Sequence, residues 1–156
     1  MAFTDLTTPN ITDFWTFLDT SVQIPTSALP ANSVWPQYAL NQILDLILQP
    51  PGGSGLLLCL AAYNGATHIL LSITPDQSGQ TYFADARGNG PSGFNLVNPS
   101  TGIVQASSDQ STSQSLATPD WAKMMTVGDL DFYKTPWGRY FLNWQQSYGP
   151  TIWGLV

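Results

Sequence analysis

The chain has 156 residues and a mass of 17.0 kDa, which is the size of a single domain. Only 9% of its residues are charged and the formal net charge is −6, so it lacks the Lys and Arg needed to bind DNA or RNA tightly through the phosphates. Aromatic residues make up 12%, which argues against disorder, and a surface this poor in charge is typical of a protein whose faces are covered in an assembly.

A short first helix is predicted from about residue 12. Thr12 is suited to cap its first turn, and the apolar side chains spaced to share one face are Phe14, Phe17 and Leu18. The residues that precede it, MAFTDLTTPN, contain neither a basic residue nor an apolar run, so we expect no secretory signal there.

A second helix is expected to begin near Asn32 or Ser33, with Pro36 in its first turn, where a missing N–H costs little. It should end before Gln49, because the proline that follows Gln49 disfavours helical geometry at that residue. The spacing of the apolar residues predicts a buried stripe made of Trp35, Ala39, Ile43, Leu46 and Ile47.

Residues 54–73 predict a long third helix that is apolar almost all round. Such a helix is either the central core helix of a bundle or a membrane span. We favour the core helix, because no basic residue flanks the segment and because four residues unsuited to mid-bilayer depth interrupt it. These four are Asn64, Gly65, Thr67 and His68.

Residues 74–101 are polar and rich in Gly and Pro, which predicts a long loop. A stretch of this length is typical of a functional loop, a disordered loop or a linker. Within it, Tyr82-Phe83-Ala84 fits a short strand. Arg87-Gly-Asn-Gly90 places one basic residue among turn formers and matches no phosphate-binding pattern.

Residues 102–117 fit either a polar β-hairpin or a disordered Ser-rich linker. In the hairpin, strands 103–107 and 111–116 would pair around a turn at 108–110. One of its faces would carry Ser111, Ser113 and Ser115. Since such a hairpin has too little apolar surface to stand alone, we expect it to need a partner such as a neighbouring subunit.

The last helix is predicted over 135–149, where Thr135 caps the first turn and a Gly-Pro pair ends the helix. A single aromatic stripe is expected along it, made of Trp137, Tyr140, Phe141, Trp144 and Tyr148. A tail that is half apolar follows, at residues 150–156.

Together these elements predict a mainly α protein, organised as a single domain over residues 1–156. The expected fold is a small helical bundle with an inserted long loop and a polar β-hairpin before the last helix. Its parts are a helical core at about 12–73 and 135–149, the loop at 74–101, the hairpin at about 102–117 and the C-terminal tail at 150–156.

Cys59 and His68 are the candidates for a thiol–imidazole pair. Nine residues apart on one helix, they would face opposite ways, so we interpret both as core residues and expect His68 to bond to Asn64. One His and one Cys make a poor metal site, and Asp129 and Asp131 lack the other ligands of a calcium loop. We therefore expect no catalytic, metal-binding or cofactor-binding residue.

The C-terminal stretch LDFYKTPWGRYFLNWQQSYG, residues 130–149, resembles the ending of a group of tailed-phage head–tail adaptor proteins. In those proteins a Thr-Pro-aromatic-Gly turn opens a final helix that ends in Tyr-Gly. Two earlier segments are similar and follow in the same order. LAAYNGATH, residues 60–68, resembles their apolar helix, and IVQASSDQSTSQSL, residues 103–116, resembles their Ser-rich segment. The loop at 75–99 has no counterpart.

The resemblance implies a structural protein of the virion neck and not an enzyme. Copies would form a homo-oligomeric ring under the portal protein and extend the DNA channel toward the tail or tail-terminator protein. Genomic DNA would only pass through the channel, and neither a membrane nor a cofactor would be involved. The protein would be found at the head–tail junction, and in the host cytoplasm during assembly.

Two surfaces are expected to make the contacts in such a ring. The hairpin would add to a neighbour's strands, and the apolar tail would dock on the portal or a tail component. The candidate interface residues are Trp153, Leu155, Val156, Ser111, Ser113 and Ser115. The alternatives are another virion structural protein, such as a tail terminator or minor capsid protein, a small hydrolase that uses His68, or a carbohydrate-binding module.

Overall fold

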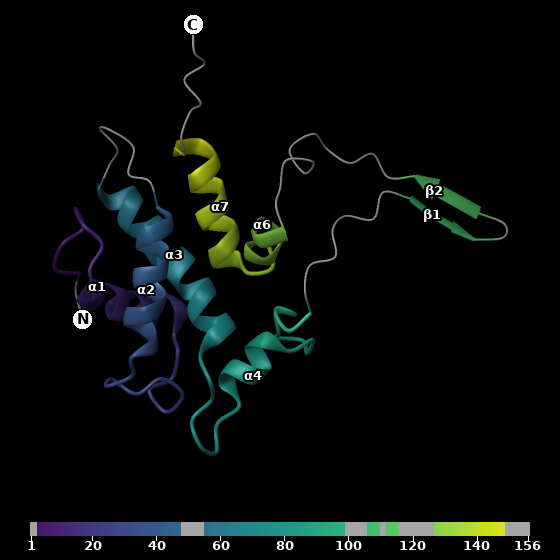
Figure 1. Ribbon diagram of the computed structural model, residues 1–156. Coiled ribbons are helices and arrows are strands. Elements are labelled where there is room, and N and C mark those ends of the chain that lie inside the picture. Colours follow the sequence, from purple (N-terminus) through teal and green to yellow (C-terminus); the bar gives the residue numbers. More distant parts are fainter. Residues whose placement is uncertain (1–2, 48–54, 99–105, 110–111, 116–126, 149–156) are drawn as a thin grey trace, which may run out of the picture.

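The computed structural model describes residues 3–47, 55–98, 106–109, 112–115 and 127–148. Within these ranges the chain is mainly helical, which confirms the predicted fold class (Figure 1). In chain order the elements are α1 (Ile11–Phe17), the π-helical turn η1 (Leu18–Val22), α2 (Trp35–Leu46), α3 (Gly55–Ile73), α4 (Tyr82–Arg87), β1 (Ala106–Asp109), β2 (Thr112–Ser115), α6 (Val127–Phe132) and α7 (Pro136–Tyr148).

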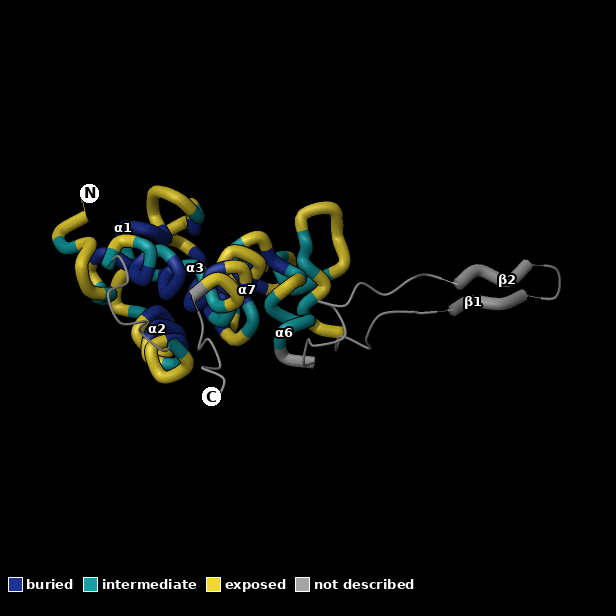
Figure 2. The backbone as a smooth tube through the Cα atoms, turned by 90° about the horizontal axis from the view of Figure 1, so that it is seen from above, coloured by how far each residue is buried: buried dark blue, intermediate teal, exposed yellow. Residues whose placement is uncertain are grey.

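Helix α3 is the centre of the bundle. Helices α2 and α7 both pack along it, and α4 lies at its C-terminal end. It is long and apolar enough to cross a membrane, but most of it is buried inside the protein. Figure 2 shows that the buried stretches lie where α1, α2, α3 and α7 face one another. Helix α3 therefore forms the central core helix, as predicted.

Three helices meet at Gly65, near the middle of α3. A Cβ atom on this residue would lie 2.8 Å from Ile43 Cδ1 of α2 and 2.9 Å from Phe141 Cδ2 of α7. Both neighbours are buried, and a close-packed core has no free space into which they can move. A glycine at this position is therefore what lets α2 and α7 both lie directly against α3.

Helix α2 begins slightly later than predicted, at Trp35, because Pro30 and Ser33 close a turn in front of it through a 2.9 Å backbone hydrogen bond. Pro36 takes the first turn, as predicted. The prediction for Leu46 was wrong, since this side chain is 55% exposed on the last turn of the helix. The residues that α2 buries are Pro36, Ala39, Leu40 and Ile43.

The prediction that Thr12 caps the first helix was wrong, because Asn10 caps α1. The side-chain oxygen of Asn10 accepts a hydrogen bond from the N–H of Asp13 (2.9 Å). The carboxylate of Asp13 is itself buried and accepts hydrogen bonds from the N–H groups of Thr4 (2.6 Å) and Asp5 (2.8 Å). These bonds tie the start of the described chain to α1, which helical periodicity alone does not reveal.

The same end of the bundle is held by two buried polar groups. Burial alone would raise the pKa of Asp13, but the hydrogen bonds that its carboxylate accepts outweigh burial and lower the pKa to about 2. Tyr63 of α3 stacks on Phe14 with 5.7 Å between ring centroids, and its hydroxyl accepts a hydrogen bond from the N–H of Asn10 (3.1 Å). The predicted apolar face of the first helix, made of Phe14, Phe17 and Leu18, is buried here.

The predicted strand at Tyr82-Phe83-Ala84 was wrong, because these residues open helix α4. The reason lies several residues earlier, at Asp76. Its carboxylate accepts hydrogen bonds from the N–H groups of Phe83 (2.7 Å) and Ala84 (2.8 Å), which the first turn of a helix leaves without partners. The negative charge also suits the N-terminal end of the helix dipole.

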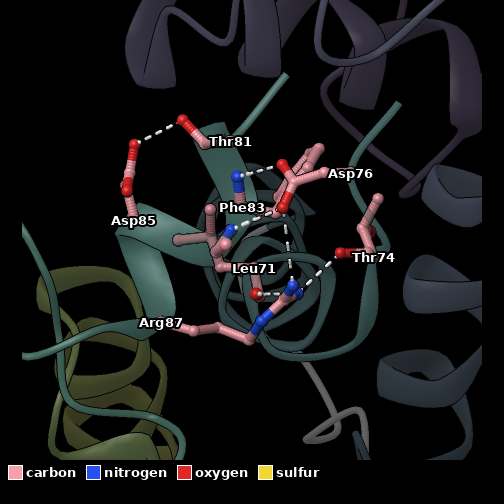
Figure 3. Close-up of polar contacts among 8 residues, drawn as sticks. Leu71, Thr74, Asp76, Thr81, Phe83, Asp85 and Arg87 are labelled. Carbon is pink, nitrogen blue, oxygen red and sulfur yellow. Dashed lines mark hydrogen bonds and ion pairs between the residues drawn. The ribbon is translucent and has the colours of Figure 1, made fainter. Parts of the chain in front are cut away.

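Arg87, at the end of α4, fixes the joint between α3 and α4 (Figure 3). Its Nη1 atom donates hydrogen bonds to the carbonyl oxygens of Leu71 (3.3 Å) and Thr74 (2.6 Å), which terminate α3. Its Nη2 atom lies 3.9 Å from Asp76. The segment predicted as one long loop therefore contains a helix that is attached to the core.

Strands β1 and β2 form an antiparallel hairpin of four residue pairs. Because Asp109 pairs with Thr112, the predicted turn at 108–110 was placed too early. Figure 1 shows the hairpin apart from the helices, and the main packing partner of each strand is the other strand. The backbone of the hairpin thus presents edges that the helical bundle does not cover.

Helix α7 begins as predicted, with a proline in its first position and with the Oγ1 atom of Thr135 accepting the N–H of Gly138 (2.9 Å). The predicted aromatic stripe is correct for Phe141 and Trp144, which are buried. It was wrong for Tyr140, which is 40% exposed because it lies at the edge of the buried face.

The short helix α6, which no sequence pattern predicted, turns back against the start of α7. A Cβ atom on Gly138 would lie 2.0 Å from the carbonyl oxygen of Phe132, so glycine is required at this close approach. The ring of Phe132 then packs against Phe141, with 5.2 Å between centroids. The same ring also stacks on His68, which brings α6 to the surface of α3.

We predict that Gly65→Ala lowers the free energy of unfolding by about 1 kcal/mol. Alanine gains about 1 kcal/mol in helix propensity, but overpacking a core costs typically 1–3 kcal/mol, and the contact with Phe141 is fully buried. Urea denaturation measures the change. Gly90→Ala is the control, because no atom lies within 4 Å of its Cβ position. A Gly65→Ala protein as stable as the wild type would contradict the close approach of the three helices.

Candidate functional site

An open groove with a volume of about 320 Å³ lies where α2, α3, α6 and the chain after α4 converge. Its apolar wall is formed by Ile69 and Ile73 of α3, Leu96, and Phe132 of α6. Ile73 is 36% exposed and the other three are half-buried, so the wall is open to solvent. We call this feature the α3–α6 groove.

The polar side chains that line the α3–α6 groove are largely engaged within the chain. Gln42 donates a hydrogen bond to the hydroxyl of Tyr38 (2.7 Å), and Ser72 donates one to the backbone carbonyl of His68 (2.9 Å). Asp131 pairs with Lys134 at 2.9 Å. The groove therefore offers mainly apolar surface.

His68 forms the floor of the groove and links it to α7. Its Nδ1 atom lies 2.9 Å from the Oγ1 atom of Thr135, and its ring stacks on Phe132 with 4.4 Å between centroids. Burial lowers the pKa of His68 to about 4, and of the two nearby charges Asp131 opposes this shift while Lys134 adds to it. The imidazole is therefore neutral at pH 7.

The bond between His68 and Thr135 resembles a base–hydroxyl pair, but its surroundings assign it a structural role. Thr135 is fully buried, and its Oγ1 atom also accepts the N–H of Gly138 at the start of α7. A hydroxyl in this position is out of reach of a substrate. Thr135 instead joins the cap of α7 to the central helix.

Cys59 and His68 do not meet. Nine residues along α3 separate them by about 13 Å, and their neighbours differ. Burial raises the pKa of Cys59, whose thiol interacts with Tyr63 near α1. The predicted hydrogen bond from Asn64 to His68 was wrong, because the side chain of Asn64 donates to the carbonyl of Leu60 (2.7 Å).

No group of three or more His, Cys, Asp or Glu side chains that could hold a metal ion occurs in the described part of the chain. Asp131, one of the two carboxylates that the sequence singled out, is held by Lys134. The described residues thus give no geometry for metal chemistry.

Two of the six predicted interface residues fall in a described element. Ser113 and Ser115 belong to β2, where they pair with Ser108 and Ala106 of β1. The side chains of the hairpin are outside the description. The other four residues, Trp153, Leu155, Val156 and Ser111, also lie outside the described residues.

No sequence pattern predicted the α3–α6 groove. Its wall is built from three segments far apart in the chain, so no single pattern contains it. One signal was present, namely the apolar pair Leu96-Val97 within a polar segment. Leu96 lines the groove, and Val97 beside it is 70% exposed.

Comparison of the chain with protein-family models, with curated proteins and with solved structures finds no match. The resemblance of residues 130–149 to head–tail adaptors therefore stays a hypothesis.

We predict that the free energy of unfolding falls by about 3 kcal/mol between pH 6.5 and pH 4. His68 has a folded pKa of about 4 and an ordinary pKa of 6.5, so within this window the unfolded chain binds a proton that the folded chain excludes. Stability is therefore lost as the pH falls toward the folded pKa. Urea denaturation at several pH values measures the slope.

This experiment is well defined because His68 is the only histidine. The control is His68→Gln, which keeps a polar side chain but does not titrate, and which should lose the slope between pH 5 and pH 6.5. A wild-type stability that stays constant over this interval would contradict a buried, neutral imidazole.

Proposed function

We propose that this chain is a structural protein of a tailed-phage neck. In this proposal, copies form a ring between the portal and the tail and extend the DNA channel at the head–tail junction. The observation that carries the proposal is the polar hairpin of β1 and β2, which extends from a helical bundle whose packing it does not share.

A two-stranded hairpin is at best marginally stable in water, and stability normally requires a third strand or a packed helix. Both outer edges of the β1–β2 hairpin carry backbone groups without strand partners among the described residues. Pairing with a neighbour's strand would satisfy these groups. A ring supplies such a neighbour to every copy.

The charge distribution supports the same proposal. The chain has four basic residues, and two of them are occupied internally. Arg87 holds the end of α3, and Lys134 pairs with Asp131 and donates to the carbonyl of Asn98. A ring with a net negative surface repels the DNA phosphates, so the duplex passes without sticking.

In this proposal the chain performs no reaction. In the described residues the single imidazole is engaged with a buried hydroxyl, and the single thiol lies at the other end of α3. The partners would be the portal on one side and a tail or tail-terminator protein on the other.

The exposed hairpin also fits another virion structural protein, such as a tail terminator or a minor capsid protein. The two proposals differ in the partner that they require. A neck adaptor binds the portal, whereas a terminator binds the tail tube. Pull-down with each purified component separates them.

We predict that the full chain mixed with portal protein forms rings visible by negative-stain electron microscopy. Replacing residues 106–115 by a short Gly-Ser linker should abolish the rings, because it removes the strands that join neighbours. Circular dichroism should show unchanged helix content and an unchanged Tm, since the helices do not depend on the hairpin.

Ser78→Pro is a matched control, because it lies in an exposed turn distant in sequence from the hairpin, and it should leave ring formation intact. Wild-type chain that remains monomeric in the presence of portal and does not bind it would overturn the proposal.

A further inference from the structure

The α3–α6 groove presents apolar surface that the described chain leaves open. Ile73 is 36% exposed on its wall, and Tyr38, whose hydroxyl bonds to the lining residue Gln42, is 50% exposed. The one charged side chain of the lining, Asp131, is already paired with Lys134. A neutral, apolar segment is therefore the occupant that the groove fits best.

The C-terminal residues have this chemistry. The sequence from 149 to 156 is GPTIWGLV, which contains no Asp, Glu, Lys or Arg and carries four apolar side chains, Ile152, Trp153, Leu155 and Val156. An indole fills a large part of a site of this size and buries a large apolar area. The question is whether the tail of the same copy or of another copy fills the groove.

The direction of α7 answers this question. Thr135, in front of α7, touches His68 at the groove, whereas Phe141 further along touches Gly65, so α7 runs antiparallel to α3 and away from the groove. From Pro136 to Tyr148 the helix rises about 18 Å. Figure 1 shows that α7 starts beside α6, which lines the groove, and ends far from it.

Trp153 follows Tyr148 by five residues, which span at most about 18 Å when fully extended. To reach its own groove, the tail would have to be fully extended and run straight back along the whole of α7. A groove on a second copy carries no such restriction. The geometry thus favours binding between copies.

We propose that the C-terminal tail of one copy, with Trp153 and Leu155 as anchors, binds the α3–α6 groove of the next copy. This inference rests on the proposed function, because it assumes that copies assemble side by side. The contact joins two different surfaces, so its repetition closes into a ring when the rotation between copies allows it.

The test measures self-association of the full chain by sedimentation velocity over a range of concentrations. A tail variant, Trp153→Ala with Leu155→Ala, and a groove variant, Ile73→Asp, should each weaken association at least about tenfold, since buried aromatic anchors dominate such contacts. Leu46→Asp is the matched control, because Leu46 is exposed and lies outside the groove. If Ile73→Asp does not fold, Ile73→Ser replaces it.

Mixing the two variants gives the decisive result. The tail variant keeps an intact groove and the groove variant keeps an intact tail, so the mixture should form a heterodimer that cannot grow further. Absence of the heterodimer, or a groove variant that associates like the wild type, overturns the inference. So does a wild-type chain that is monomeric at every concentration.

Failure of this inference is distinguishable from failure of the proposed function. If wild-type rings form on portal and both variants form them equally well, the neck function stands and the tail contact is wrong. If the groove variant self-associates normally but no longer binds portal, the occupant is a portal segment and the inference is overturned. If the heterodimer forms and portal is not bound, the tail contact stands and the neck function fails.

Discussion

The close packing of three helices at Gly65 is the constraint on which the rest of the structure depends. Because this residue has no side chain, Ile43 and Phe141 approach α3 from two sides at van der Waals distance. That approach fixes the position of α7 along the central helix. It thereby sets which residue of α3 faces the cap of α7, and where α6 has to lie. The groove beside His68 is a consequence of this arrangement.

The bond between His68 and Thr135 uses that arrangement to connect a helix cap with the core. A cap alone stabilises one helix end, typically by about 1 kcal/mol. Here the capping hydroxyl also bonds to a buried imidazole of the central helix, so the start of α7 and the middle of α3 are held together. The stack of His68 on Phe132 adds α6 to the same unit. A neutral polar side chain can do this in the core, since no charge has to be buried.

The sequence predicted what depends on neighbouring residues and missed what depends on distant ones. The Thr135 cap and the apolar character of α3 follow from local chemistry, and both were predicted. The strand expected at Tyr82 became a helix because of Asp76, and His68 found its partner 67 residues away instead of one turn earlier. The groove combines residues from separate segments, so its position follows only from the packed bundle. The turn of the hairpin was predicted too early in the sequence, because a segment rich in Ser and Thr has no alternation of apolar residues that would fix the register.

The buried carboxylate of Asp13 and the buried imidazole of His68 hold different helices and respond to acid in different ranges. The Asp13 carboxylate stays charged until the pH approaches 2, so the stability that it contributes is lost only as the pH falls below the ordinary pKa of 3.8. The stability that depends on the neutral His68 ring is lost earlier, as the pH falls from 6.5 to about 4. Acidification should therefore loosen α6 and α7 while the amino-terminal helices stay docked on α3. The two halves of this small protein would then open in sequence, through a partly folded species in which amide protons of α7 exchange before those of α1.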